Sequence, residues 1–72
     1  MLTEGQRAKL ITWESESAQV EAKNGVTLEF HEVYMGDHSE YWIIQKENGI
    51  EIARHNTRYI QSIVWEQEVK DA

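Results

Sequence analysis

The sequence of 72 residues contains no cysteine and no proline, and it has only four glycines. Without cysteine the fold cannot be held by disulfides, and the usual cysteine-rich zinc sites are excluded as well. The scarcity of proline and glycine excludes a linker-like or disordered composition. A chain of this length buries only a small core, so association with further copies is the main remaining source of stability.

Positive charge is also scarce, because seven Lys and Arg residues stand against thirteen acidic residues, giving a net charge of −6. An acidic protein repels phosphate backbones, so we expect no nucleic-acid partner unless a local basic patch forms. No apolar run approaches the ~18 residues of a membrane span, and the first residues lack the pattern of a secretion signal. We therefore expect a cytoplasmic protein with no membrane partner.

No residue pattern predicts an enzyme. The carboxylates alternate along the chain as a solvated strand face does, and there is no glycine-rich phosphate loop. The serines lack the context of an activated nucleophile, and the histidines lack a second ligand at metal-binding spacing. We predict no catalytic residue, no metal and no cofactor. The residues considered are Ser15, Ser17, Ser39, Ser62, His31, His38 and His55.

The first predicted element is a short N-terminal helix. Thr3 followed three residues later by Gln6 matches a capping box, and the residues after Gln6 are good helix formers. This pattern predicts a helix over residues 3–11. Because the segment has few apolar side chains to bury, the helix would cover the domain rather than form its centre.

The rest of the chain has the alternation of half-buried strands, from residue 18 to residue 65. Asn24-Gly25 predicts a β-hairpin turn, and a shift of the alternation at Glu32 predicts a β-bulge. Further turns are expected at residues 36–39, 47–49 and 56–59. Five bent strands around one small core favour a closed barrel of SH3, Sm or OB type, because closure protects the sheet edges.

We therefore predict a single domain, residues 1–72, of the mainly β (α+β) class. It would consist of the short N-terminal helix, a five-stranded, strongly bent SH3/Sm-like barrel over residues 18–65, and a polar tail over residues 66–72.

The order of these elements resembles the Sm-like family, the Hfq type in particular. Residues 20–28 look like the family's first-motif hairpin, and residues 59–64 look like its closing Ile-x-x-Val-Val stretch. Phe30 stands where the family has a glycine, and Thr57-Arg58 replaces its lysine-histidine pair, so the family's RNA contacts are not carried over. The resemblance implies a homo-oligomer in which subunits pair the edges of their last two strands.

Residues 54–59 form the candidate ligand-binding segment. They bring together two of the three arginines with hydrogen-bonding and aromatic groups, and guanidinium groups bind phosphate or carboxylate in a bidentate manner. The alternative is that both arginines pair with nearby glutamates of an acidic surface. Tyr34 and Tyr41, on either side of the loop at Gly36, are candidate loop anchors. The candidate ligand-binding segment itself consists of Arg54, His55, Asn56, Thr57, Arg58 and Tyr59.

Three functional hypotheses stay open. The first is a non-enzymatic, homo-oligomeric Sm-like barrel that captures an anionic small ligand such as a nucleotide, as a phage protein that sequesters a host signal would. The second is a protein-binding adaptor or inhibitor whose acidic surface meets a basic partner. The third is an Sm-like RNA-binding protein, which would bind RNA in a salt-sensitive manner. A nucleotide that raises the melting temperature would distinguish the first from the second.

Overall fold

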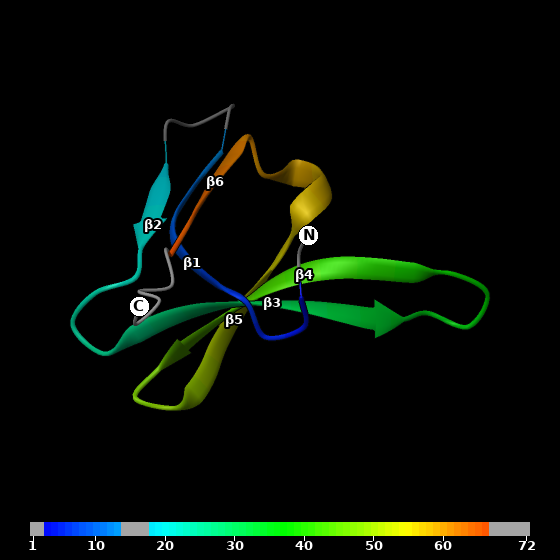
Figure 1. Cartoon of the computed structure of the whole chain (residues 1–72), viewed down its shortest axis with the longest axis horizontal. Coiled ribbons are helices and arrows are strands. Elements are labelled where there is room, and N and C mark those ends of the chain that lie inside the picture. The colour runs from blue at the N-terminus through cyan, green and yellow to red at the C-terminus, as the bar shows by residue number, and fades with distance from the viewer. Residues whose placement is uncertain (1–2, 14–17, 67–72) are drawn as a thin grey trace, which may run out of the picture.

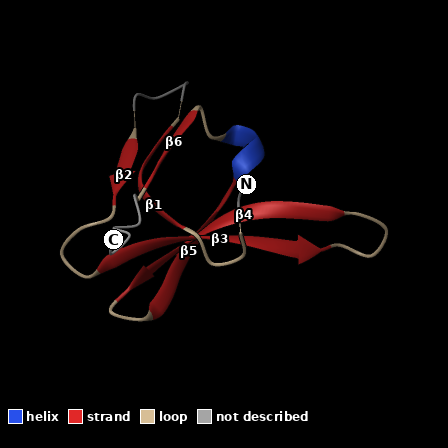
Figure 2. Ribbon diagram, in the orientation of Figure 1, coloured by secondary structure: helices blue, strands red, loops and turns tan. Residues whose placement is uncertain are grey.

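The computed structural model describes residues 3–13 and 18–66. Within them, antiparallel strands form one sheet that curls into a half-barrel (Figure 1). A short 3-10 helix lies between the last two strands (Figure 2). The elements are β1 (Arg7–Thr12), β2 (Gln19–Glu21), β3 (Val26–Tyr34), β4 (Ser39–Glu47), β5 (Ile50–Asn56), η1 (Thr57–Tyr59) and β6 (Ser62–Trp65).

The mainly β character is confirmed, but the described residues contain six strands rather than five and lack the expected N-terminal α-helix. The closed barrel predicted over residues 18–65 is wrong, because the sheet stays a half-barrel and includes β1 at Arg7–Thr12. None of the helical structure in residues 3–13 and 18–66 is long and apolar enough to cross a membrane. Of the predicted tail at residues 66–72, only Glu66 belongs to the described residues.

The helix predicted over residues 3–11 is wrong because this segment turns and then enters β1. Gly5 adopts a φ of +80°, which is outside the helical region. The backbone N–H of Gln6 donates to the carbonyl oxygen of Thr3 at 3.0 Å and closes the turn. Immediately afterwards Ala8 is fully buried in the sheet. Tertiary strand pairing thus outweighs local helix propensity.

β1 joins the two parts of the sheet because both of its edges are paired. Ile11 lies between Val20 of β2 and Ile63 of β6, while Ala8 pairs with Leu28 of β3. β2 and β3 therefore follow one another along the same edge of β1. From there β3, β4 and β5 form a three-stranded meander.

The two Asn-Gly turns form where the sequence predicts them. Asn24 and Asn48 have φ values of 55° and 52°, and the glycine after each also has a positive φ. The Asn48-Gly49 turn joins β4 to β5 as a hairpin. The hairpin expected at Asn24-Gly25 is wrong, because β2 and β3 both pair with β1 instead of with each other.

The expected β-bulge at Glu32 is also wrong. β3 pairs with β4 without interruption from Val26 to Tyr34. The register shift lies instead in the β4–β5 pair, where Gln45 faces Ala53 and Lys46 faces Glu51. This register leaves Ile52 of β5 without an opposite residue, so the bulge belongs to β5.

The core lies where β1, β3 and β4 meet. Its members have little or no solvent exposure, and Trp13 and Trp65 pack against them from the edges of the cluster. Both tryptophans therefore contribute packing area at the edge of the core. The residues of this cluster are Ala8, Ile11, Leu28, Phe30 and Ile43.

Candidate functional site

The structure distributes the predicted ligand-binding segment over both faces of β5 and over η1. Arg54 faces Ile44 across the β4–β5 pair and His55 faces Ile43, so the two side chains lie on opposite faces of the sheet. Arg54 donates through Nε and Nη2 to both carboxylate oxygens of Glu51, the second at 3.3 Å. This hydrogen bonding lowers the pKa of Glu51 and raises that of Arg54.

The β-bulge explains the ion pair between Arg54 and Glu51. In a regular strand, residues three apart point to opposite faces of the sheet. The extra residue, Ile52, brings Glu51 onto the face of Arg54. The guanidinium group is therefore already engaged by a carboxylate of its own strand.

His55 contributes to packing on the other face of β5. Its ring meets that of Trp13 edge-on, with ring centroids 4.9 Å apart, and its Nε2 lies 2.8 Å from Oε1 of Gln45. Burial lowers the pKa of His55. Burial therefore favours the neutral form of this imidazole more than solvent favours it in an exposed histidine.

Asn56 and Thr57 attach η1 to β4. Asn56 Oδ1 accepts a hydrogen bond from the backbone N–H of Arg58 at 2.9 Å, which caps η1, and Asn56 Nδ2 donates to Glu40 Oε1 at 2.9 Å. Thr57 Oγ1 donates to the backbone carbonyl of Tyr41 at 3.0 Å. Both side chains thus have structural partners within the protein.

Arg58 and Tyr59 are the two members of the segment that project from η1 with exposed side chains, and Tyr59 is 69% exposed. None of the six predicted residues lines the pocket that lies beside the neighbouring hairpin.

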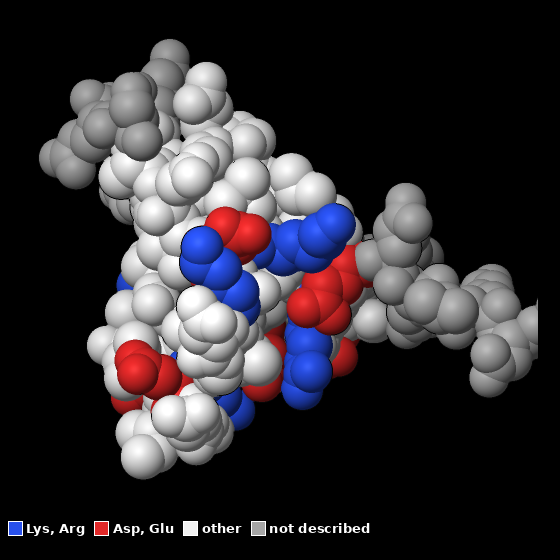
Figure 3. Space-filling view, turned by 90° about the vertical axis from the view of Figure 1, so that its left-hand side faces the viewer, with Lys and Arg blue, Asp and Glu red and all other residues white. Residues whose placement is uncertain are grey.

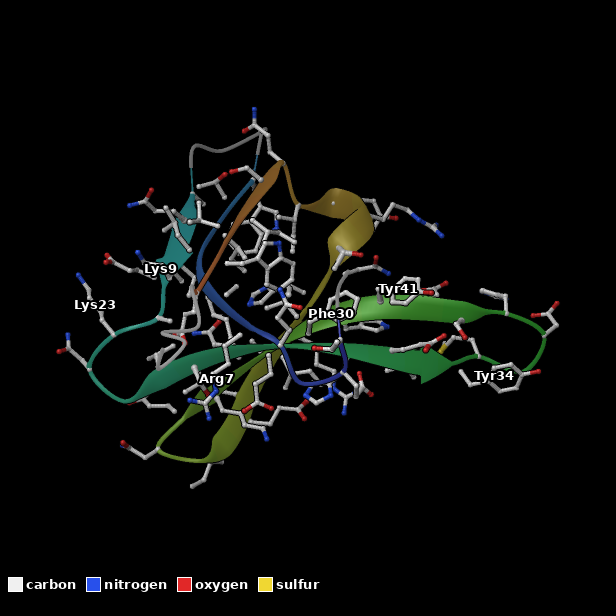
Figure 4. The ribbon with its side chains drawn as sticks, in the orientation of Figure 1. Arg7, Lys9, Lys23, Phe30, Tyr34 and Tyr41 are labelled. Atoms are coloured by element: carbon white, nitrogen blue, oxygen red, sulfur yellow. The ribbon has the colours of Figure 1, made fainter. Side chains whose placement is uncertain are left out.

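This pocket lies against the β3–β4 hairpin, which extends away from the rest of the sheet (Figure 1). We call residues 32–41 of this hairpin the arm, and the cavity of about 460 Å³ the arm pocket. Glu4, Phe30, Glu32 and Tyr41 line it. Figure 4 shows Phe30 and Tyr41 close together on neighbouring strands, and their rings stack with centroids 5.5 Å apart and planes 9° apart.

Strand register places three of the four lining residues on one face. Glu32 lies directly opposite Tyr41, and Phe30 is two residues away along β3. Cross-strand partners share a face, as do residues two apart in a strand. The buried residue Leu28 belongs to the same face, so the pocket continues the core surface onto the arm.

The N-terminal segment supplies the fourth residue, Glu4, and fixes it in place. The backbone N–H of Gly5 donates to the carbonyl of Phe30 at 2.7 Å. The backbone N–H of Glu32 donates to Glu4 Oε1 at 2.9 Å, and His31 Nδ1 is 3.6 Å from the same oxygen. The pocket therefore carries two carboxylates beside two aromatic rings, and no Lys or Arg among residues 3–13 and 18–66 lines it.

A second polar cluster occupies the end of the arm. His38 lies 2.6 Å from Asp37 through Nδ1 and 3.2 Å from Glu40 through Nε2. The hydrogen bond to Asp37, followed by that to Glu40, raises the pKa of His38, and His38 in turn lowers the pKa of Glu40. Among the residues that the structure describes, no three His, Asp or Glu side chains are grouped to hold a metal ion.

Three basic side chains lie on a different part of the molecule from the arm. Figure 4 places Arg7, Lys9 and Lys23 away from Tyr41 and Tyr34. On the face shown in Figure 3, Lys and Arg side chains alternate with Asp and Glu. Lys23 Nζ, for example, is 3.4 Å from Glu21. This face has no continuous basic patch of the kind that binds a phosphate backbone.

The sequence-based prediction included one residue of the arm pocket. Tyr41, a candidate loop anchor, lines the pocket, whereas Tyr34 is 71% exposed and is not a lining residue. Phe30 and Glu32 were missed although the alternation in β3 places them on one face. Glu4 was missed because its segment was expected to be helical.

No family model, no curated protein and no solved structure matches this chain. Its function must therefore be inferred from the geometry of the site.

Proposed function

We propose that this chain is a non-catalytic binding protein that engages a positively charged segment of another protein at the arm pocket. One observation carries the proposal: among the residues that the structure describes, the pocket is lined by two aromatic rings and two carboxylates and by no basic side chain. Aromatic faces and carboxylates both attract cations. The net charge of −6 adds long-range attraction for a basic partner.

Capture of an anionic ligand through the arginine segment has less support. Arg54 is paired with Glu51, so a phosphate would have to displace an internal carboxylate before it could bind there. Arg58 is exposed, but its charge interacts with the side chains of Glu40 and His38 at the end of the arm. An anionic ligand that reached this place would meet negative charge as well as positive charge.

The proposal is tested by titrating the protein with an unstructured peptide of alternating arginine, lysine and serine. We expect binding that weakens as salt rises, because exposed charges are screened. Glu32→Gln should weaken binding by roughly two- to fivefold, the effect of about 0.5–1 kcal/mol for one exposed charge. The matched control is Glu47→Gln, because Glu47 is an exposed glutamate of the same hairpin that does not line the pocket.

Two results would contradict the proposal. One is equal affinity of the native protein, Glu32→Gln and Glu47→Gln for the basic peptide. The other is a thermal-shift panel in which a nucleotide raises the melting temperature while the basic peptide does not bind. The second result would favour the hypothesis that the protein captures a nucleotide.

We also propose that the chain forms a homo-oligomer, on an observation independent of the arm pocket. β5 is the last strand in the sheet order β2-β1-β3-β4-β5, so its outer edge has no neighbour among the described strands. Ile50 and Ile52 of this strand are 69% and 51% exposed. Unpaired edges with exposed apolar residues are sites where another chain adds a strand.

A further inference from the structure

We infer that the arm pocket receives the guanidinium group of a partner arginine, stacked on Tyr41 and paired with Glu4 and Glu32. This inference rests on the proposed function and names the chemical group that the pocket recognises.

The aromatic wall favours a flat cation. The ring of Tyr41 is held parallel to that of Phe30, which is itself 8% exposed, so the orientation of Tyr41 is fixed from the core side. Tyr41 is 45% exposed and lines the pocket, so part of its ring is open to a ligand. A guanidinium group is planar and stacks on aromatic faces, whereas an ammonium group is a compact, strongly hydrated charge.

The two carboxylates favour a cation with several directed donors. Glu4 comes from the N-terminal segment and Glu32 from β3, so acceptors reach the pocket from two separate parts of the chain. The backbone N–H of Glu32 positions Glu4 through one oxygen. A carboxylate can accept further hydrogen bonds, and the guanidinium fork offers five N–H donors. One arginine can therefore stack on Tyr41 and bond to both glutamates.

Two of the protein's own arginines are engaged outside the pocket. Arg54 pairs with Glu51 on β5, and the charge of Arg58 acts on Glu40 and His38 at the end of the arm. Nδ1 of His31 lies 3.6 Å from Oε1 of Glu4, the oxygen that also accepts from the backbone N–H of Glu32.

The test compares N-acetyl-arginine methylamide with N-acetyl-lysine methylamide, each titrated into the 15N-labelled full chain. We expect chemical shift changes at the amides of Glu32 and Tyr41, and at least threefold tighter binding of the arginine compound. Tyr41→Ala should weaken its binding about tenfold, as the loss of a cation–π contact does. Tyr41→Phe should retain most of it, because stacking does not need the hydroxyl group.

Tyr34→Ala is the matched control, since Tyr34 is an exposed tyrosine of β3 that does not line the pocket. If Tyr41→Ala does not fold, Glu32→Gln provides the second variant and should also weaken binding. Equal affinity for the two compounds would overturn the guanidinium inference and leave the proposed function standing. Arginine-induced shifts confined to Asp37 and Glu40 would overturn the assignment to the pocket. Failure of both the basic peptide and the arginine compound to bind would overturn both proposals.

Discussion

Single ionisable side chains in this protein take their properties from neighbours on their own strand and on the adjacent strand. Glu29 of β3 accepts a hydrogen bond from His31 at 3.0 Å and lies 3.3 Å from Lys46 of β4. The His31 bond, and after it Lys46, lower the pKa of Glu29 against the opposing effect of burial. The partner on β4 follows from the β3–β4 register, which the sequence alone does not fix.

His55 provides a prediction at this scale. Burial lowers its pKa below 6.5, so near that pH the unfolded chain binds protons more tightly than the folded chain. Its contribution to the unfolding free energy should be complete above pH ~6.5 and be lost as the pH falls through that value toward the folded pKa. We expect the stability of the native protein relative to His55→Gln to rise between about pH 5 and pH 7, measured by urea unfolding.

His38→Gln is the control with the opposite sign. The pKa of His38 is raised, so its contribution is present below pH ~6.5 and is lost as the pH rises through the folded pKa. If the native protein and His55→Gln had parallel pH profiles, the imidazole of His55 would not be held neutral by the fold.

Among the elements, those fixed by local backbone chemistry could be predicted. Asn24-Gly25 and Asn48-Gly49 form turns because both residues need a positive φ, which asparagine and glycine tolerate best. The helix was mispredicted because the conformation of this segment is decided by the pairing of β1 with a strand far along the chain, which overrides its local helix propensity. The bulge was misplaced for the same reason, since the unmatched residue Ile52 depends on the β4–β5 register.

The two turn glycines allow a matched prediction at this scale. Gly25→Ala and Gly49→Ala both place a side chain at a positive φ, which costs about 1–2 kcal/mol. Gly25→Ala also brings the new Cβ to 2.5 Å from Oδ1 of Asn48, whereas nothing lies within 4 Å of a Cβ at Gly49. We therefore expect a larger loss of unfolding free energy for Gly25→Ala in urea denaturation.

The double variant Gly25→Ala/Asn48→Gly removes the obstructing side chain. It should recover part of the excess loss, because only the contact with Asn48 distinguishes the two sites. Equal destabilisation by Gly25→Ala and Gly49→Ala would show that Asn48 moves aside without cost.

For the whole molecule, the sequence indicated the general class of protein better than it indicated the site. Composition and alternation predicted a mainly β chain, and Tyr41 was chosen as an anchor because it borders the arm loop. The pocket itself combines Glu4 with Phe30 and Glu32, and their proximity arises only when the N-terminal segment lies along β3. Such adjacency depends on tertiary pairing, which a single sequence does not specify.

The edge of β5 gives the prediction for the assembly. We expect light scattering to give a solution mass at least twice that of the monomer, rising with protein concentration. Ile52→Lys should lower the mass, because a charged side chain at a strand edge opposes pairing with another chain. Met35→Lys is the control, since Met35 is 49% exposed and lies in the loop between β3 and β4 rather than on a strand edge. A monomeric mass at every concentration would contradict self-association.

The double pairing of β1 also sets the order in which the fold can be completed during synthesis. Ala8 is made before every residue of β3 and β6, yet one of its neighbours is Trp65 of β6. The β3–β4–β5 meander has short connections and can pair while later residues are still being added. The edge of β1 that pairs with β6 stays open until Trp65 has been made, so a nascent chain leaves one edge of its central strand unpaired while residues 9–65 are synthesised.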